Sequence, residues 1–245
     1  MISAVTLTKN EEENIKDCLK SLEFCDERIV IDDNSTDDTV KLAIAEGAKV
    51  YQKALNSDFA AQRNFGLEKA ISDWVLFIDA DELISNNLSV EIMNKVKRKD
   101  IDGCFFKRQD IFMGKELKHG EPGNIKLLRL AQKNKGKWKR KVHEYWQIKG
   151  NVSTFKSALI HNSHKDLSEF IGTINYYSEI HARENVKENK RSSLVKILFF
   201  PILHFCNNFI LKRGFMDGSG GFVFAFLMSF HSYLSWSKQW LIQKS

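Results

Sequence analysis

The residues Trp74–Glu82, WVLFIDADE, decide the fold, because five apolar residues run directly into a cluster of carboxylates. An unbroken apolar run of this length predicts a strand that helices cover on both faces. Three earlier segments, Ile2–Leu7, Arg28–Asp32 and Ala48–Gln52, are also short and rich in apolar and β-branched residues. We therefore expect four strands in the first third of the chain.

Three helices are expected between these strands, over residues 11–22, 37–46 and 58–71. In the first of them, apolar residues recur at helical spacing on one face. Ser35 or Thr36 is placed to cap the second helix at its N-terminus, and Gly47 at its C-terminus. The alternation of strand and helix with short connections predicts an α/β fold with a doubly wound, mostly parallel sheet.

The pattern changes after residue 100. Further strands are expected over 103–112, 125–130, 142–146 and 152–160, separated by basic loops. A helix over 166–185 and two apolar, aromatic-rich segments, 194–211 and 221–242, then form a C-terminal helical extension.

Composition narrows the class of protein. A chain of 245 residues with 43% hydrophobic and 28% charged residues can bury a full core, which excludes a disordered tail. The four cysteines form no CxxC pair, so we expect buried thiols in a reducing compartment. The N-terminal segment turns acidic after a short apolar run and is not typical of a secretion signal, which favours a cytoplasmic location.

The charge is divided unevenly along the chain. Residues 1–100 contain 13 Lys or Arg and 20 Asp or Glu, whereas residues 101–245 contain 24 and 11. Such asymmetry suggests an anionic partner, which could be a nucleic acid, a phospholipid or a phosphorylated substrate. No recognised nucleic-acid-binding motif accompanies the basic half, so we expect no nucleic acid partner.

Polar and acidic residues follow three of the predicted strands, where a doubly wound sheet binds its ligands. They are Thr8-Lys9-Asn10, Asp32-Asp33-Asn34-Ser35 and Asp79-Ala80-Asp81-Glu82. Two carboxylates two residues apart, as in Asp79 and Asp81, can hold one hard cation against phosphate oxygens. The ordinary alternative is that carboxylates end strands because they are solvated.

Without further context, Asp33 and Arg63 are weaker candidates for ligand-binding residues. A carboxylate at the position of Asp33 can accept a hydrogen bond from a base or a ribose hydroxyl, although the run around it also reads as a simple helix cap. Arg63, within the helical QRNFG segment, would by default belong to a solvated helix face.

The combined motifs resemble a known family. TLTKNEEENI, IVIDDNSTDDT, the QRN-containing helix and VLFIDADE occur in the order and spacing of inverting family 2 glycosyltransferases of the GT-A fold. FMGKELKHG, KLLRLA, the basic run ending in VHE, and RGFMDGSGGFVFAFL are similar to a narrower group. That group comprises bacterial lipopolysaccharide core and related β-glycosyltransferases, including heptose-directed glucosyltransferases.

The resemblance implies roles for individual residues. Thr8, Asn10 and Glu11 match the loop that lines the nucleotide pocket, Asp33 the carboxylate that reads the base, and Arg63 the basic residue near the nucleotide. Asp79 and Asp81 match the pair that holds Mg²⁺ or Mn²⁺ on the diphosphate of the nucleotide. Glu144 matches the general base, although the chain has His143-Glu144 where the family usually has two carboxylates.

The reaction implied is the transfer of a sugar, a hexose such as glucose, from a UDP-sugar to a lipopolysaccharide-core or other lipid-linked saccharide. A single displacement inverts the anomeric centre, so a UDP-α-sugar gives a β-linkage. On this reading residues 1–100 bind the nucleotide sugar, residues 101–165 bind the acceptor, and residues 166–245 form the helical extension.

The roles of several histidines and of one basic run have two interpretations each. His161 or His164 could add a metal ligand, as a downstream histidine often does in the family, or make ordinary hydrogen bonds at a strand end. His119 is a weaker acceptor-site candidate. The run 133–141 packs six cations into nine residues and is either a solvated loop or a surface for phosphorylated sugar or anionic lipid headgroups.

The tail suggests a peripheral position on the inner face of the cytoplasmic membrane. Residues 194–211 contain Lys196, His204, Asn207 and Asn208, which disfavours a helix that crosses the bilayer. The aromatic and basic residues of 221–242 are typical of interfacial helices. Packing of both helices on the catalytic domain as ordinary core is the alternative.

Three other functions compete with this interpretation. A haloacid-dehalogenase-type phosphatase also uses two aspartates after an apolar strand, but on its first strand and without the Glu82 that follows here. A sugar nucleotidyltransferase needs a glycine-rich loop after the first strand, and TLTKNEEEN has none. A non-catalytic saccharide-binding protein on the membrane surface remains possible, and the intact carboxylates argue against it.

Overall fold

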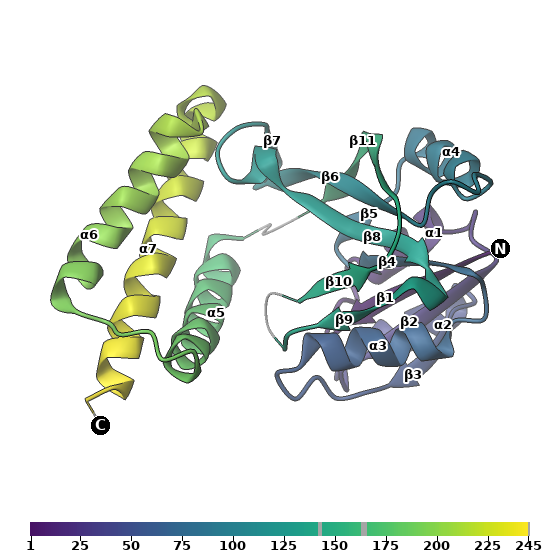
Figure 1. Cartoon of the computed structure of the whole chain (residues 1–245), viewed down its shortest axis with the longest axis horizontal. Coiled ribbons are helices and arrows are strands. Elements are labelled where there is room, and N and C mark those ends of the chain that lie inside the picture. The colour runs from purple at the N-terminus through teal and green to yellow at the C-terminus, as the bar shows by residue number, and fades with distance from the viewer. Residues whose placement is uncertain (142–143, 163–165, 245) are drawn as a thin grey trace. The chain divides into compact units, whose positions relative to one another are not determined.

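The computed structural model describes residues 1–141, 144–162 and 166–244 (Figure 1). The chain forms two compact units. The first comprises Met1–Arg108 and Lys126–His161, and the second comprises Gln109–Ile125 and Asn162–Ser245.

Four parallel strands form one half of the sheet in the first unit. They are β1 (Ile2–Thr8), β2 (Glu27–Asp32), β3 (Lys49–Gln52) and β4 (Trp74–Asp79), in the order β3-β2-β1-β4. In the register, Thr8 of β1 lies beside Asp32 of β2, and Leu7 lies beside Asp79 of β4. The polar ends of these three strands therefore meet at one edge of the sheet.

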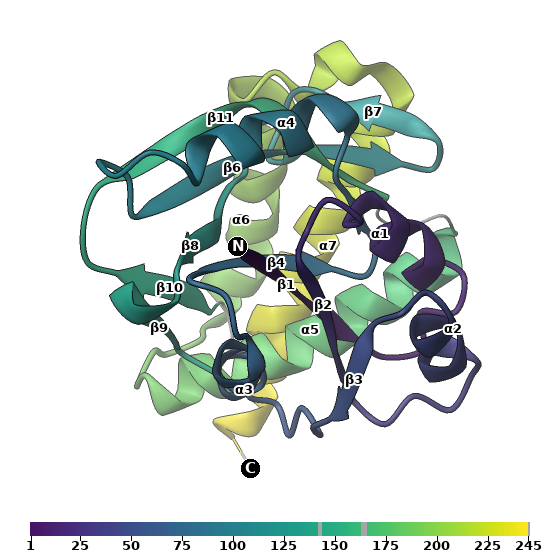
Figure 2. The same cartoon turned by 90° about the vertical axis from the view of Figure 1, so that its right-hand side faces the viewer.

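Helices cover both faces of the parallel strands (Figure 2). One face packs on α1 (Ile15–Ser21), α2 (Thr39–Ala45) and α4 (Asn86–Lys95), and the other on α3 (Phe59–Lys69). Alternate residues of β4 divide between the two cores: Leu76 and Ile78 join the first face, whereas Val75 and Phe77 join the second. Burial on both faces explains why this strand is apolar throughout.

Antiparallel strands continue the sheet beyond β4. They are β8 (Lys126–Gln132), β6 (Gly103–Phe112), β11 (Val152–His161) and β5 (Glu82–Leu83), with β7 (Lys115–Leu117) paired to β6. A separate hairpin joins β9 (Gly136–Lys139) to β10 (Tyr145–Ile148). Short 3₁₀ turns occupy Pro122–Asn124 and Lys133–Lys135.

Several local features differ from the sequence prediction. The helix α4 and the strands β5, β7 and β9 were not predicted. Neither Ser35 nor Thr36 caps α2, which begins at Thr39 after Asp38. Instead the Asp37 carboxylate accepts hydrogen bonds from the amide and hydroxyl of Thr39, because α2 starts later than expected. Gly47 does follow the end of α2 in a left-handed conformation, with φ of +79°.

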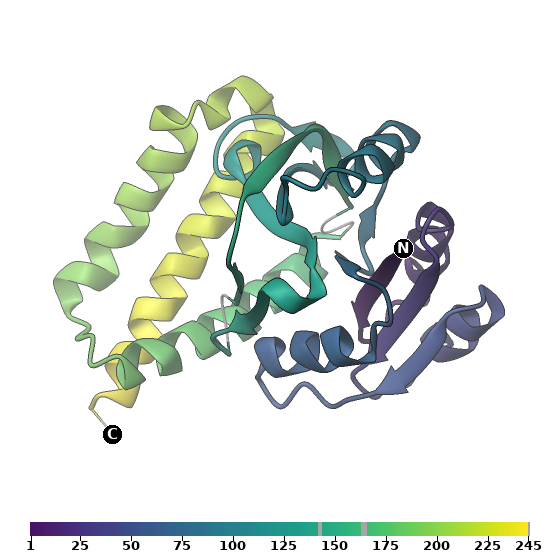
Figure 3. The same cartoon turned by 45° about the vertical axis from the view of Figure 1, so that its right-hand side comes forward.

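The second unit is mainly helical. Its elements are α5 (Leu167–Lys187), α6 (Leu194–Phe205), a π-helical turn (Cys206–Leu211), a 3₁₀ turn (Gly214–Asp217) and α7 (Gly218–Ile242). The helix α7 packs against both α5 and α6 (Figure 3). The hydrophobic core of the second unit contains Phe112, Leu117, Phe170, Ile174 and Leu227.

One helix in the described part of the chain, Leu194–Leu211, is long and apolar enough to cross a membrane by length and composition. Its mean hydropathy is 1.7, and 17% of the segment is buried within the protein. A single helix of this kind is weak evidence for a membrane span.

The four cysteines are free thiols. Burial raises the pKa of Cys25 to about 12 and that of Cys104 to about 11. These thiols therefore stay protonated at neutral pH and are poor nucleophiles. The observed α/β sheet with its C-terminal helices confirms the predicted fold class.

Candidate active site

The carboxyl ends of β1, β2 and β4 bring the predicted residues to one edge of the sheet in the first unit. The Thr8 hydroxyl donates to Asp32 at 3.2 Å, so the ends of β1 and β2 are joined by their side chains. Asp79 ends β4 beside Leu7. The register of the parallel strands thus places residues that are far apart in sequence around one small region.

The loop after β1 is held by the loop after β2. Asn10 has a positive φ of 54°, its amide donates to the Ser35 hydroxyl at 2.9 Å, and its side-chain oxygen accepts from the Thr36 amide at 2.8 Å. The Glu11 amide donates to the Thr39 hydroxyl at 2.7 Å. Ser35, Thr36 and Thr39 therefore shape the loop that contains Asn10 and Glu11.

Asp33 is buried and rigidly placed. One carboxylate oxygen accepts from the Leu55 amide at 2.7 Å, and the other pairs with Lys9 at 2.9 Å. A carboxylate with two such partners keeps one orientation. Its place at the carboxyl end of β2 suits a group that recognises the polar edge of a ligand.

Arg63 links two of the predicted acidic residues. Its Nε donates to Glu144 and its Nη2 donates to Asp79, both at 2.9 Å, while the arginine is only 4% exposed. The guanidinium lies 4.7 Å from the centre of the Trp138 ring, which supports it by a cation–π contact. A buried arginine in α3 thus holds together residues that are 65 positions apart in the chain.

Arg129 completes the cluster and was not assigned a role from the sequence. It lies on β8, is buried, and forms ion pairs with Asp79 and, at 3.3 Å, with the fully buried Glu82. Glu82 in turn accepts the Asp79 backbone amide at 2.9 Å. The available signal was an arginine inside the otherwise apolar LLRLA segment, since a buried arginine requires an acidic partner.

Positive and negative side chains alternate through this cluster, and each charge shifts the pKa values of its neighbours. Burial alone would raise the pKa of Asp79, but Arg129 and Arg63 outweigh it and hold that pKa well below its usual range. Burial raises the pKa of Glu82, and repulsion from Asp79 adds to the effect despite the attraction of Arg129. Asp79 is therefore held as a carboxylate, and both of its oxygens accept hydrogen bonds from arginine side chains.

Asp81 borders this cluster, since its negative charge adds to the repulsion that raises the pKa of Glu82, and it pairs with a histidine. Its Oδ2 is 3.1 Å from His161 Nε2, at the end of β11. The Asp81 side chain is 31% exposed, and that of Asp79 is 32% exposed. His164, the alternative ligand, and His143 lie outside the described residues.

The carboxylates of Asp79 and Asp81 suit a divalent cation only where a substrate completes its coordination. Carboxylate and imidazole suit Mn²⁺, and carboxylates suit Mg²⁺. Among the described residues, no group of three or more His, Cys, Asp or Glu side chains is arranged to hold a metal without other ligands. One or two carboxylates completed by substrate phosphates are the usual arrangement for Mg²⁺.

Two further features that the sequence suggested for acceptor binding, His119 and the basic run 133–141, lie outside the Asp79 cluster. His119 belongs to the second unit, where its Nδ1 lies 2.8 Å from Asp217. The basic run is not simply a loop, because Gly136–Lys139 forms β9 with Trp138 buried and Lys137 and Lys139 exposed.

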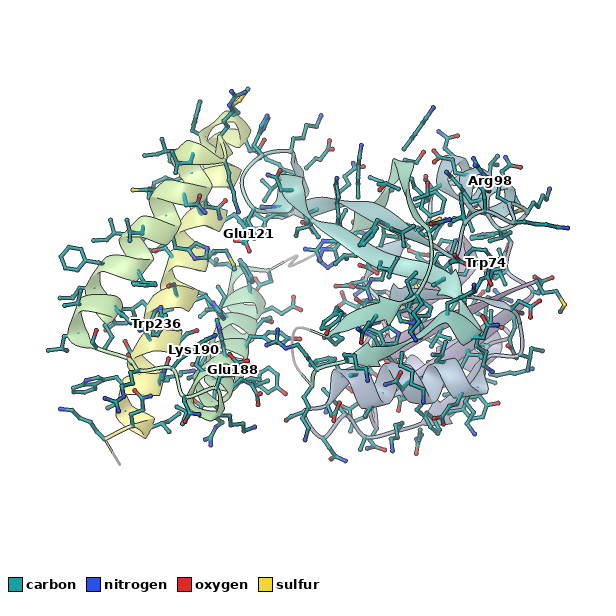
Figure 4. The ribbon with its side chains drawn as sticks, in the orientation of Figure 1. Trp74, Arg98, Glu121, Glu188, Lys190 and Trp236 are labelled. Carbon is teal, nitrogen blue, oxygen red and sulfur yellow. The ribbon has the colours of Figure 1, made fainter. Side chains whose placement is uncertain are left out.

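A hollow lined by Trp74, Arg98 and Lys133 lies elsewhere in the first unit. Figure 4 labels Trp74 and Arg98. Trp74 is the first residue of β4 and Asp79 the last, so the two ends are about 17 Å apart at the rise of a strand. This hollow is therefore separate from the Asp79 cluster.

Comparison with known proteins places the chain among glycosyltransferases. An uncharacterized glycosyltransferase of Rickettsia typhi is 28% identical over 97% of this chain and 86% of the relative. The lipopolysaccharide core biosynthesis glycosyltransferase LpsC of Rhizobium meliloti is also 28% identical, over 97% of this chain and 91% of the relative. A solved structure of S. aureus TarS is 16% identical and covers all of this chain and 90% of its own, with a TM-score of 0.49, too low to carry an argument.

The model of the family described as "Glycosyl transferase family 2" matches residues 3–165. That range runs from the second residue of β1 to beyond the end of β11 and includes every residue of the Asp79 cluster. Since the match spans more than half of the chain, the chain belongs to glycosyl transferase family 2.

Proposed function

We propose that the protein is a metal-dependent, inverting hexosyltransferase that moves a sugar from a UDP-sugar to a lipid-linked saccharide, such as the lipopolysaccharide core. The observation that carries the proposal is the single guanidinium of Arg63, which binds both Asp79 and Glu144 at 2.9 Å. It ties a carboxylate suited to the donor diphosphate to a carboxylate suited to the acceptor hydroxyl. Donor and acceptor chemistry thus share one anchored group.

The donor is bound at the carboxyl ends of β1, β2 and β4. Asp33 reads the base, and the loop with Thr8, Asn10 and Glu11 encloses the nucleoside. Arg63 gives the diphosphate a fixed positive charge nearby. The carboxylates of this edge need a cation between them and the diphosphate, because phosphate oxygens would otherwise be repelled.

Asp79 and Asp81 would hold Mg²⁺ or Mn²⁺, and the substrate phosphates would supply further ligands. When bound, the ion neutralises the charge that develops on the leaving diphosphate. Arg63 and Arg129 keep Asp79 ionised and in one orientation, so that the site is formed before the donor arrives.

Glu144 accepts the proton of the acceptor hydroxyl as that oxygen attacks the anomeric carbon. Arg63 binds Glu144 through Oε1, which leaves Oε2 as the atom to receive the proton. The attack from the side opposite the diphosphate inverts the anomeric centre, so a UDP-α-hexose gives a β-linkage. No covalent intermediate with the enzyme is required.

The acceptor class is supported by the relative named for lipopolysaccharide core biosynthesis, which aligns over 97% of this chain. A lipid-linked acceptor also agrees with an apolar and basic second unit. We accordingly place the enzyme peripherally on the inner face of the cytoplasmic membrane.

Purified protein incubated with Mn²⁺, UDP-hexoses and deacylated core oligosaccharides tests this proposal. We expect transfer from one UDP-hexose, a β-linkage in the product by NMR, and loss of transfer with EDTA. Glu144→Gln keeps the oxygen that Arg63 binds, so we expect UDP binding to persist while kcat falls by about 10²- to 10⁴-fold.

A non-catalytic saccharide-binding protein is the outcome that would replace the proposal. It predicts that UDP-hexoses bind without turnover when a competent acceptor is present. It also predicts that Glu144→Gln changes neither binding nor any measured rate.

A further inference from the structure

The helix α6 and the π-helical turn after it carry their polar and apolar residues on the wrong faces for a helix in water. A surface helix normally turns apolar residues inward and polar residues outward. In α6 the six large apolar side chains that face outward are each between 57% and 64% exposed. They are Leu194, Val195, Leu198, Phe199, Ile202 and Leu203.

Three of the polar residues of the same segment, Lys196, His204 and Asn208, face the protein instead, whereas Asn207 is exposed. Lys196 lies 4.8 Å from the centre of the Trp236 ring on α7, and His204 lies 3.3 Å from Glu121. Asn208, which is 2% exposed, accepts the Glu121 amide at 2.7 Å. Trp236 lies toward the end where α6 begins and Glu121 toward the end where it finishes (Figure 4). The inner face is therefore fixed to the second unit along its length.

The apolar surface continues onto α7. Phe222, Phe226, Phe230 and Tyr233 are exposed at helical spacing along one side of α7. The ring of Phe222 contacts those of Phe205 and Phe209, which join the two helices into one aromatic and aliphatic surface. A continuous exposed surface of this kind marks an interaction site rather than ordinary solvent exposure.

Charge identifies the partner. From residue 189 to the C-terminus the chain contains seven Lys or Arg and a single acidic residue, Asp217. Lys190 and Arg191 precede the apolar segment, and Lys212 and Arg213 follow it directly. Basic residues at both ends of an apolar helix face match anionic lipid headgroups around a hydrocarbon surface. A protein partner would not require this distribution.

We propose that the outer face of α6, extended by the exposed aromatic residues of α7, inserts into one leaflet of an anionic phospholipid bilayer and lies in its plane. The segment does not cross the bilayer, because Lys196, His204 and Asn208 on its other face bind the protein. This inference deepens the peripheral location in the proposed function by naming the surface that contacts lipid.

The test is co-sedimentation of the full chain with vesicles of phosphatidylcholine alone or with roughly 30% phosphatidylglycerol added. We expect strong binding to the anionic vesicles. The double variant Leu198→Glu/Ile202→Glu should weaken that binding by about tenfold or more, since two inserted apolar groups become charged. Both positions are exposed, so thermal unfolding should be nearly unchanged.

Ile44→Glu is the matched control. Ile44 lies on α2 in the first unit and is 59% exposed, close to the 62% of Leu198, so the control should bind vesicles as the wild type does. Lys212→Gln/Arg213→Gln should reduce both the binding to the anionic vesicles and its salt dependence.

Two results would overturn the proposal. One is that the wild type and Leu198→Glu/Ile202→Glu bind both vesicles equally or not at all. The other is a lipid-free dimer in sedimentation velocity that the same double variant dissociates, because the face would then join two copies of the chain. UDP-hexose binding in solution is measured without vesicles, so failure here leaves the proposed reaction standing, and failure of the reaction leaves this result standing.

Discussion

At the scale of single residues, the site depends on buried charges that satisfy one another. Arg129 pairs with both Asp79 and Glu82, and Glu82 is fully buried. A buried carboxylate that loses its partner is strongly destabilising, whereas removal of a whole pair is often tolerated. The cluster should therefore respond very differently to single and paired substitutions.

We expect Arg129→Met to lower the free energy of unfolding by about 3–5 kcal/mol, because it leaves Glu82 buried without its cation. Urea denaturation measures this change. Arg129→Met combined with Glu82→Gln should recover more than half of the loss. If Arg129→Met is as stable as the wild type, the ion pair between Arg129 and Glu82 does not contribute to stability.

Asp33 provides a test of donor recognition. Asp33→Asn keeps the shape of the side chain but removes the charge, and we expect it to weaken UDP binding by about 10- to 100-fold, as for a hydrogen bond to a charged group. Isothermal titration measures this affinity. Asp38→Asn, at an exposed position in the same run, is the control and should bind UDP normally. Equal weakening by both variants would mean that Asp33 has no particular role in recognition.

Glu27 gives a prediction for the pH dependence of stability. Burial would raise the pKa of Glu27, but bonds from Lys49 and Ser3 outweigh it and lower that pKa. A lowered pKa means that this stabilisation is present above the unfolded value, about 4.3, and is lost as the pH falls through the folded value. Glu27→Gln should therefore be about 1 kcal/mol less stable at pH 7, and the difference should shrink below pH 4. A difference that stays constant from pH 7 to pH 3 would contradict this account.

At the scale of elements, the β9–β10 hairpin supports Arg63, because the Trp138 ring of β9 packs against the guanidinium. Asn64 on α3 accepts the Trp138 amide at 2.9 Å and donates to the Trp138 carbonyl at 3.0 Å, which fixes β9 to α3. Trp138 packs against Phe77 and stacks on Trp146. The hairpin therefore places an aromatic ring against the guanidinium.

Asn64→Ala should release β9 from α3. We expect hydrogen exchange to quicken in Gly136–Lys139 while β1 keeps its protection, with a stability loss of about 1–3 kcal/mol for the two unmade bonds. Hydrogen exchange followed by mass spectrometry measures both strands in one experiment. Uniform loss of protection in both strands would mean that the bond supports the whole fold and not the hairpin alone.

The sequence predicted the elements whose signal is local. The apolar run of β4 and the register of polar strand ends were sufficient to place Thr8, Asp33 and Asp79 together. The helix α4 was missed although Leu88 and Ile92 are spaced one turn apart and Ser85 caps it, and β5 is only two residues long. Arg129 could not be assigned, because only the pairing of β8 with β4 brings it to Asp79, which lies 50 positions earlier in the chain.

At the scale of the whole molecule, the acidic and basic parts of the sequence serve different ligands in this account. The carboxylates of residues 1–100 need a cation before they can bind a diphosphate. The cations near the C-terminus match an anionic surface without any metal. Removal of divalent metal should therefore abolish donor binding and leave vesicle binding unchanged.

The most direct test of the central claim is calorimetric titration of the purified chain with a panel of UDP-, GDP- and CMP-sugars, with Mn²⁺ or Mg²⁺ and with EDTA. The account predicts that a UDP-hexose binds only when the metal is present, and that Asp81→Asn weakens this binding at least tenfold. If no sugar nucleotide binds with either metal, the Asp79 cluster is not a donor site and the proposed transfer is wrong.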